Sequence, residues 1–218
     1  MRDSLSVGAV MYPGFEMLDM FGPLEMFSML GSTRVAISMV AEHPDPVPTA
    51  VAENLTAGPK VLADTTFAEA PQYDLLLVPG GFGTLPALES TPLLEFLRDQ
   101  AASADVVASV CSGSVLLARA GLLDGKRATS NKQLFALATR EAAPVEWVEE
   151  ARWVEDGNVF TSSGVSAGTD MALAIIERLY DVATAENAAA AAEYTWHRDK
   201  DHDPFVAHLN ELAALFEG

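Results

Sequence analysis

The sequence predicts an α/β fold with a mostly parallel sheet that is covered by helices on both faces. Three observations predict it: short apolar runs typical of buried strands, amphipathic helical segments that alternate with them, and glycine- or proline-rich turns between the two. Strands of parallel sheets are near-continuously apolar because both of their faces are buried. In such sheets the ligand site lies outside the carboxyl ends of the strands.

The expected elements follow from the apolar periodicity, taken in chain order. Strands are predicted at 5–12, 34–41, 74–78, 106–110, 127–130, 145–148, 151–154 and 159–162, with a proline-rich loop at 43–48, short strands and turns over 51–66 and a hairpin turn at 155–158. Helices are predicted up to about Leu30 with Pro23 in the first turn, then at 92–102, from the cysteine turn to Gly121, at 133–140, from about 169 to 179, at 183–193 and at 204–216.

Length and composition indicate one ordinary globular domain. The chain has 218 residues, of which 50% are hydrophobic and 20% charged, and we expect a single domain over 1–218 with 195–218 as a C-terminal tail packed on it. The net charge of −18 argues against nucleic acid or an anionic membrane as a partner, since both favour basic surfaces. One cysteine excludes an internal disulfide and a thiolate metal cluster, and the N-terminus has no long apolar run. The chain is therefore expected to be cytoplasmic with a free thiol.

The stretch from Ser109 to Ser114 places that cysteine, Cys111, between a predicted strand and a predicted helix. Small residues surround it, as a tight turn requires. A thiol at this corner lies close to the first free N–H groups of the helix. Those groups and the helix dipole favour an anion, so we expect them to lower the pKa of the thiol and to hold an oxyanion. The pattern is typical of a nucleophile elbow with Cys in place of Ser.

Two further features fall on the same edge of the predicted sheet. Asp19 follows the first strand, and Gly80-Gly81 follow the strand at 74–78. A carboxyl beside a thiolate is expected to have a raised pKa, because two adjacent anions repel and one proton is shared. A protonated Asp19 can then donate its proton during a reaction. The backbone N–H groups of Gly81 and Ser112 are candidate donors to a developing anion.

The histidines argue against a Cys-His pair. Only His43, His197, His202 and His208 are present, and none lies at the elbow or in the central segments. Asp19 is therefore favoured over histidine as the proton donor. The acids and histidines of 197–203 are more typical of a solvated loop than of a metal site. We expect no metal and no organic cofactor.

Three motifs carry a resemblance to the DJ-1/PfpI (ThiJ/PfpI) superfamily, over nearly the whole chain. They are the acid in 18–23, the glycine turn in 78–83 and the elbow in 109–114. The sequence most closely resembles the isonitrile (isocyanide) hydratases, with an aspartate as the acid and the shared patterns 120–123, 127–129, 157–158 and 167–170. The resemblance implies a flavodoxin-like three-layer sandwich, related to class I glutamine amidotransferases, and a homodimer.

The resemblance also implies a chemistry and a set of site residues. Cys111 would attack the terminal carbon of a small isonitrile, Asp19 would protonate that carbon, and water would hydrolyse the thioimidate to an N-substituted formamide, a lyase (hydro-lyase) reaction. Gly80, Gly81, Ser112 and Asn131 are the expected oxyanion- or substrate-binding residues, with the Ser112 hydroxyl helping to place substrate or water.

Two positions depart from patterns seen in the superfamily, and they leave other functions open. Ser112 follows the cysteine where many protease-like relatives have His, and Asn131 stands where many glyoxalase-type relatives have a second His. A glyoxalase III-like or amidase-like enzyme using the same thiol is one alternative. A non-catalytic redox sensor, in which Cys111 is oxidised to a sulfinic acid, is another. The sequence does not fix the physiological substrate.

Overall fold

A seven-stranded sheet forms the centre of the protein, in a computed structural model that describes residues 4–141 and 144–212. Its order is β10-β11-β7-β6-β1-β2-β5, and only β10 runs antiparallel to its neighbour. The strands are β1 (Leu5–Val10), β2 (Val35–Ala41), β5 (Thr65–Thr66), β6 (Leu75–Val78), β7 (Val106–Val110), β10 (Trp153–Asp156) and β11 (Val159–Ser162). The predicted α/β class with a mostly parallel sheet is confirmed.

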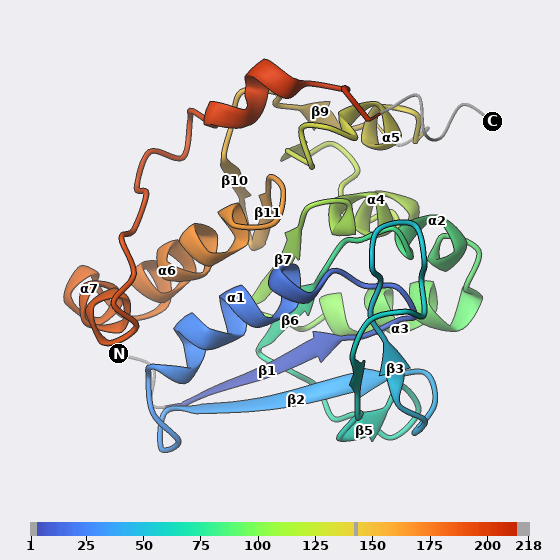
Figure 1. Cartoon of the computed structure of the whole chain (residues 1–218). Helices are drawn as coiled ribbons and strands as arrows, with labels where there is room; N and C mark the ends of the chain where they lie inside the picture. Colours follow the sequence, from blue (N-terminus) through green and yellow to red (C-terminus); the bar gives the residue numbers. More distant parts are fainter. Residues whose placement is uncertain (1–3, 142–143, 213–218) are drawn as a thin grey trace.

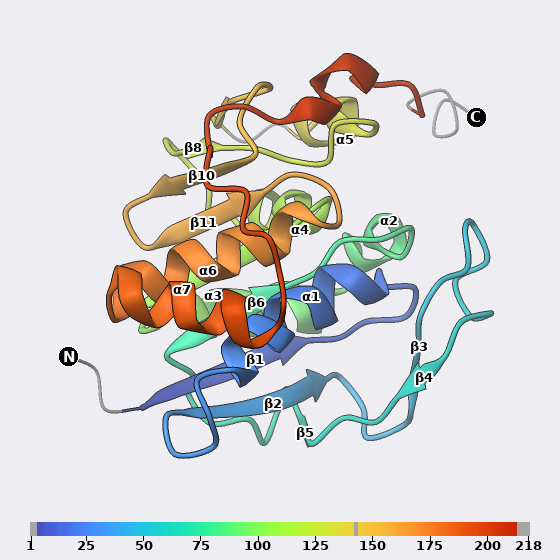
Figure 2. The same cartoon turned by 60° about the vertical axis from the view of Figure 1, so that its left-hand side comes forward.

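Helices cover both faces of this sheet, which gives three layers (Figures 1 and 2). One layer contains α1 (Met17–Ser28), α6 (Ala167–Leu179) and α7 (Val182–Ala191), which pack against one another. The other contains α2 (Thr84–Ala87), α3 (Thr91–Ala101) and α4 (Gly113–Arg119). Strands β6 and β7 are completely buried between the layers, as their uninterrupted apolar sequences predict.

Smaller elements lie outside the main sheet. Strands β3 (Val47–Pro48) and β4 (Lys60–Val61) form an antiparallel pair, and β8 (Arg127–Ala128) pairs in parallel with β9 (Glu146–Trp147). Helix α5 (Phe135–Thr139) follows β8, and a 3-10 helix, η1 (Pro204–His208), lies near the end of the chain. Within the described ranges, no helix has the length and apolar character needed to cross a membrane.

The order of the strands places a switch point between β1 and β6. The chain leaves β1 through α1 toward β2, whereas it leaves β6 through α3 toward β7 on the other side and over the opposite face. The connections after β1 and β6 therefore diverge and leave a crevice at their carboxyl ends. Asp19, Gly80 and Cys111 follow β1, β6 and β7 and converge on this crevice.

The start of α1 corrects one sequence prediction. The helix begins at Met17, so Pro23 is its seventh residue and not part of its first turn. Proline there removes the N–H that would bond the carbonyl of Asp19. Burial of Met20, Leu24 and Phe27 in the core offsets that loss. As a result, Asp19 lies inside the first turn of α1.

The C-terminal prediction is also corrected. Only Pro204–His208 are helical, and as a 3-10 helix; the predicted residues 213–216 lie outside the described residues. The chain leaves the helix at Leu209, and Asn210 has a φ of +61°. Asn210 accepts a hydrogen bond from the Ala136 N–H (2.6 Å) and donates its own N–H to the Lys132 carbonyl (2.8 Å). These contacts with the body of the protein replace further helical turns.

The remaining boundaries differ by small shifts. The predicted strands at 127–130 and 145–148 exist in shortened form, but they pair with each other outside the main sheet. Strand β10 extends through Asp156, so the predicted hairpin turn shrinks to Gly157-Asn158. The short helix α2 and the pairing of Val47–Pro48 are additional to the sequence predictions.

Candidate active site

Cys111 lies between the last residue of β7 and the first residue of α4, in a left-handed backbone conformation with a φ of +57°. Its N–H donates to the carbonyls of Ser162 and Ser163, and its carbonyl accepts from the hydroxyls of Ser114 and Ser130. A side chain at positive φ costs free energy, and such a residue persists only where several contacts hold it. The turn is therefore fixed on both sides, with the side chain only 5% exposed.

Asp19 is brought to this cysteine by the first turn of α1. Its side chain is 0% exposed; Oδ2 accepts a hydrogen bond from the Gly80 N–H (2.9 Å), and Oδ1 has no partner among the described residues. Burial raises the pKa of the carboxyl to about 8, and the charge of Glu16 adds to this, whereas the hydrogen bond from Gly80 acts in the opposite direction. Asp19 is therefore mainly protonated at neutral pH.

The pKa of the Cys111 thiol is shifted in the direction opposite to the one predicted from the sequence. Burial raises the pKa of Cys111, and the nearby charge of Asp19 raises it further. The Ser112 backbone N–H and the Asn131 amide favour the thiolate and so lower the pKa, but their effect is smaller than that of burial and the Asp19 charge. The expected net lowering of this pKa by the start of the helix is thus wrong, because the sulfur lies in the protein interior with an acid beside it. Attack by the sulfur must then be coupled to transfer of its proton.

Asn131 is held so that its amide nitrogen points at the sulfur. Its Nδ2 donates to Cys111 Sγ (3.1 Å), while its Oδ1 accepts from the Leu134 N–H (3.0 Å). The second bond assigns the two ends of the amide, since only the oxygen can accept from a backbone N–H. Gly164 packs against this amide, and a Cβ there would approach Nδ2 to 2.4 Å. The loop after β11 therefore needs glycine to leave room for Asn131.

The glycine turn shapes the site, and its N–H groups are already engaged. Gly80 donates to Asp19, and Gly81 donates to Ser112 Oγ (3.1 Å). The expected free donor at Gly81 is therefore occupied by a protein hydroxyl. A Cβ at position 80 would lie 2.5 Å from the Ser112 nitrogen, and Gly81 has a φ of +126°. Only glycine allows this close approach between the turn and the elbow.

Two residues of the site were absent from the sequence predictions. Tyr12 donates its hydroxyl to the Pro79 carbonyl (2.7 Å) and lies 3.2 Å from Thr84 Oγ1, which is 2.8 Å from Ser112 Oγ. This chain of hydroxyls fixes the side chain of Ser112. Tyr12 is the last residue of the predicted first strand and Thr84 directly follows the glycine turn, so their position at the carboxyl edge was the available signal.

The cavity next to Cys111 has a volume of about 190 Å³. It is lined by Asn131, Lys132, Gln133, Ser163, Gly164, Val165, Ser166 and Phe205. Cys111 itself does not line the cavity, but Asn131, whose amide donates to Cys111 Sγ, and Ser163, whose carbonyl accepts from the Cys111 N–H, both do. We take it as the candidate substrate cavity.

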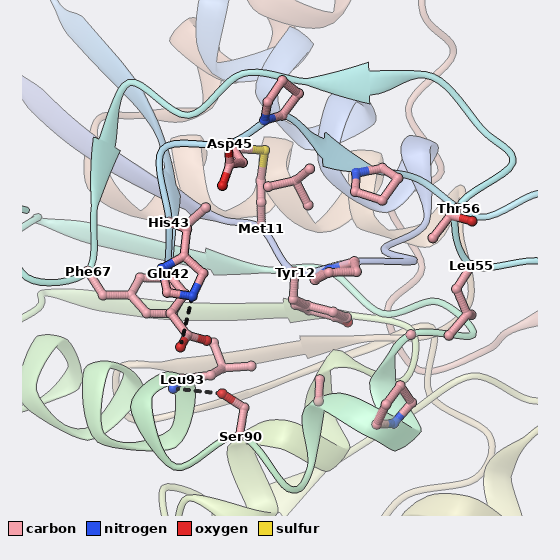
Figure 3. Close-up of a pocket in the computed structure, with 18 residues that line it drawn as sticks. Met11, Tyr12, Glu42, His43, Asp45, Leu55, Thr56, Phe67, Ser90 and Leu93 are labelled. Atoms are coloured by element: carbon pink, nitrogen blue, oxygen red, sulfur yellow. Dashed lines mark hydrogen bonds and ion pairs between the residues drawn. The ribbon is translucent and has the colours of Figure 1, made fainter.

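A larger cavity of about 430 Å³ lies beyond Tyr12 (Figure 3). Figure 3 shows Met11, Tyr12, Phe67 and Leu93 around it, with the Glu42–His43 ion pair near its wall. Unlike the smaller cavity, this one is lined by none of the residues that hydrogen-bond to Cys111. Its size therefore does not make it the reaction site.

Among the described residues, no hydrogen bond joins a tail histidine to Cys111 or Asp19. His197 contributes its backbone N–H to Asp170, and His208 pairs with Glu211 at the surface. Across residues 4–141 and 144–212, no group of three His, Cys, Asp or Glu side chains is placed to hold a metal ion.

Comparison with known proteins supports the resemblance. The model of the DJ-1/PfpI family matches residues 6–178. An isonitrile hydratase of Pseudomonas putida is 38% identical over 192 residues, which cover 88% of this chain and 79% of that protein. The crystal structure of a ThiJ/PfpI family protein from Pseudomonas syringae superposes with a TM-score of 0.80 at 34% identity, covering 98% of this chain and 87% of that one. Drosophila melanogaster DJ-1beta shares the fold, with a TM-score of 0.75 at 23% identity over 88% of this chain and 100% of that one.

Proposed function

Because the chain belongs to the DJ-1/PfpI family, we propose that it is a cysteine-dependent hydratase that converts small isonitriles to N-substituted formamides. The observation that carries the proposal is the buried pair of Asp19 and Cys111. The carboxyl has a pKa of about 8, and it lies close enough to the only thiol of the chain for its charge to raise the pKa of that thiol. An isonitrile carbon accepts a nucleophile and a proton at the same atom, which matches a thiol and an acid side by side. The 38% identity to an isonitrile hydratase supports the same substrate class.

The first step forms the C–S bond. The sulfur of Cys111 attacks the terminal carbon, and Asp19 donates its proton to that carbon as it takes the proton of the thiol. The sum is addition of S–H across the carbon, which gives R–N=CH–S–Cys with no oxidant or reductant. Coupling the two proton transfers avoids a free thiolate, which burial disfavours at this position.

The second step hydrolyses the thioimidate. Water adds to the carbon, the C–S bond breaks, and the sulfur recovers a proton through Asp19 while R–NH–CHO leaves. Asn131 already bonds to the sulfur, so we propose that its amide, with the neighbouring Ser112 backbone N–H, stabilises negative charge on the sulfur as it departs. Gly80 holds Asp19, and Gly81 with Thr84 fixes the Ser112 side chain, which follows Cys111 in the elbow.

The test is direct assay of the purified protein with a simple aromatic isonitrile. We expect loss of isonitrile absorbance with stoichiometric formation of the formamide, and no formation above background in Cys111→Ala. Absence of formamide from the unaltered protein would refute the proposal. Lactate formed from methylglyoxal without glutathione would then favour the glyoxalase III-like alternative. Stable oxidation of Cys111 without turnover would favour the redox sensor.

We also propose a cytoplasmic homodimer for this protein. Leu18 and Phe21 are large apolar side chains that remain exposed on α1, close to the buried Asp19. A second copy packed on this helix would cover them. Light scattering after size exclusion would give twice the chain mass, and Phe21→Glu would shift it toward the monomer.

A further inference from the structure

We infer that Phe205, carried by the C-terminal segment, limits the size of the substituent that the site accepts. Its side chain lines the 190 Å³ cavity together with Asn131 and the loop from Ser163 to Ser166. The inference rests on the proposed function in one respect, namely that this cavity holds the substituent R of the isonitrile. It assigns selectivity to a residue far from the cysteine in sequence.

The segment that carries Phe205 is anchored along its length. After α7 it runs past α6 and β10 toward α5 (Figures 1 and 2). Asp170 accepts hydrogen bonds from the Tyr194 hydroxyl (3.0 Å) and the His197 N–H (2.8 Å), and the Lys200 carbonyl accepts from the Arg152 N–H (2.8 Å). Anchors on two different elements fix the path of the segment before it reaches the cavity.

Asp203 then sets the position of Phe205. Asp203 is buried; its Oδ1 accepts from the Phe205 N–H (2.9 Å) and lies 3.9 Å from Arg152 Nη1. Its N–H donates to the Glu150 carbonyl (2.8 Å). The aspartate therefore caps the 3-10 helix and ties its first turn to a buried cation.

The other side of the cavity wall is fixed by Lys132, the neighbour of Asn131. Its Nζ donates to Thr129 Oγ1 (2.8 Å) and to the Ala151 carbonyl (2.7 Å), and its own carbonyl accepts from the Asn210 N–H. The C-terminal segment is thus bonded to the body of the protein both before and after Phe205. Because its backbone is held on both sides, the ring forms a defined wall.

The size of the cavity gives the expected limit. An engineered protein cavity of about 150 Å³ holds benzene. A cavity of about 190 Å³ is therefore sized for one aromatic ring, and we expect two fused rings to bind better when its wall is shortened. Phe205 is 50% exposed, so it forms the outer wall and not part of the core. Truncating it opens the cavity to solvent without leaving a buried void.

The first experiment measures access to Cys111 without using the proposed reaction. Cys111 is the only cysteine, so intact mass spectrometry reports its alkylation unambiguously. Iodoacetamide and an iodoacetamide with a naphthylmethyl group on nitrogen are compared on the unaltered protein and on Phe205→Ala. We expect Phe205→Ala to raise the relative rate of the bulky reagent about tenfold and to leave iodoacetamide within about twofold. An unchanged ratio would overturn the inference.

Matched variants separate the ring from its support. Leu62→Ala removes an exposed apolar side chain elsewhere and should leave the ratio unchanged. Asp203→Asn keeps an oxygen that can cap the 3-10 helix, whereas Asp203→Ala removes both cap and charge. If Asp203 positions the ring, the ratio in Asp203→Ala shifts toward that of Phe205→Ala and exceeds that of Asp203→Asn. Equal ratios in the two Asp203 variants, each with an unchanged circular dichroism spectrum, would refute the positioning role.

The second experiment uses turnover. For Phe205→Ala we expect kcat/KM with a naphthyl isonitrile to rise about tenfold relative to a phenyl isonitrile, mainly through KM, since the ring does not touch the reacting atoms. Phenyl isonitrile turnover without a change in this ratio would refute the inference while leaving the proposed function intact. Failure of all isonitrile turnover would refute the proposed function, and the alkylation ratio would still decide whether Phe205 controls access.

Discussion

Asp19 and Asp170 are both 0% exposed, yet their surroundings are opposite. Asp170 accepts two hydrogen bonds from the Arg152 guanidinium (2.8 and 2.6 Å), one from the Tyr194 hydroxyl and one from the His197 N–H. Asp19 accepts one backbone N–H on Oδ2, and its Oδ1 has no partner within the described part of the chain. Asp170 is paired with the Arg152 guanidinium, whereas Asp19 lies beside the Cys111 thiol.

The difference separates a structural carboxylate from a chemical one. A buried carboxylate that accepts hydrogen bonds on both oxygens, two of them from a guanidinium, anchors what surrounds it. A buried carboxyl without a cation keeps its proton to higher pH and can give that proton up during a reaction. The same residue type therefore joins the C-terminal segment to α6 in one place and serves the elbow in the other.

Replacing Asp19 by Asn gives the largest expected effect. The amide is neutral, as the carboxyl is at neutral pH, and its oxygen can accept from the Gly80 N–H, but it cannot donate an acidic proton. We expect kcat/KM for isonitrile hydration to fall about 10³-fold, or about 4 kcal/mol, with the free energy of unfolding at pH 4 unchanged within about 1 kcal/mol. Steady-state kinetics and urea denaturation measure the two. A loss of activity below tenfold would exclude Asp19 as the proton donor.

Replacing Asp170 by Asn should give the reverse pattern. The Arg152 guanidinium would remain buried without the charge of its main partner, so we expect the free energy of unfolding to fall by about 3 kcal/mol. Urea denaturation followed by tryptophan fluorescence provides the measurement. Glu186→Gln, which removes one exposed partner of Arg198, is the matched control and should cost less than about 1 kcal/mol. Equal losses of unfolding free energy in Asp170→Asn and Glu186→Gln would show that the buried pair of Asp170 and Arg152 has no special structural role.

Much of this arrangement was predictable from local sequence. The apolar runs at 74–78 and 106–110 identify buried parallel strands, and the small residues around Cys111 identify the turn after the second of them. The convergence of Asp19, Gly80 and Cys111 follows from strand ends meeting at one edge. The beginning of α1 was not predictable in the same way, because core packing of its apolar face overrode the local preference of Pro23.

Long-range contacts explain what the sequence did not predict. The partners of Asp170 are Arg152, which immediately precedes β10, and residues of the C-terminal segment, and no local pattern pairs them. The path of Phe205 depends on Asp203, which in turn depends on Arg152. The sign of the pKa shift at Cys111 depends on how deeply the turn is buried, which helix position alone does not specify.

The pH dependence of stability gives a third contrast. The pKa of Asp19 is raised to about 8, compared with about 3.9 in an unfolded chain. Between these values the folded state holds a proton that the unfolded state has lost. The contribution of Asp19 to stability is therefore complete below pH 4 and falls as pH rises to 8. Relative to Asp19→Asn, the unaltered protein should lose about 1.4 kcal/mol for each pH unit within this window. Urea denaturation at pH 5.5 and 7.5 measures this difference in free energy of unfolding. An equal difference between the two proteins at both pH values would contradict the raised pKa.

The smallest expected effect concerns the bond from Asn131 to the sulfur. When the pKa of a thiol lies well above the pH, its alkylation rate is proportional to the small fraction of thiolate. A hydrogen bond to a charged group contributes about 1.5–3 kcal/mol, so Asn131→Ala should lower the rate with iodoacetamide at pH 7 by about tenfold or more. Ser130→Ala is the control, because that hydroxyl bonds to the Cys111 carbonyl and not to the sulfur. A rate in Asn131→Ala equal to that in Ser130→Ala would show that the amide does not stabilise the thiolate, and burial and Asp19 would then control the reactivity of Cys111.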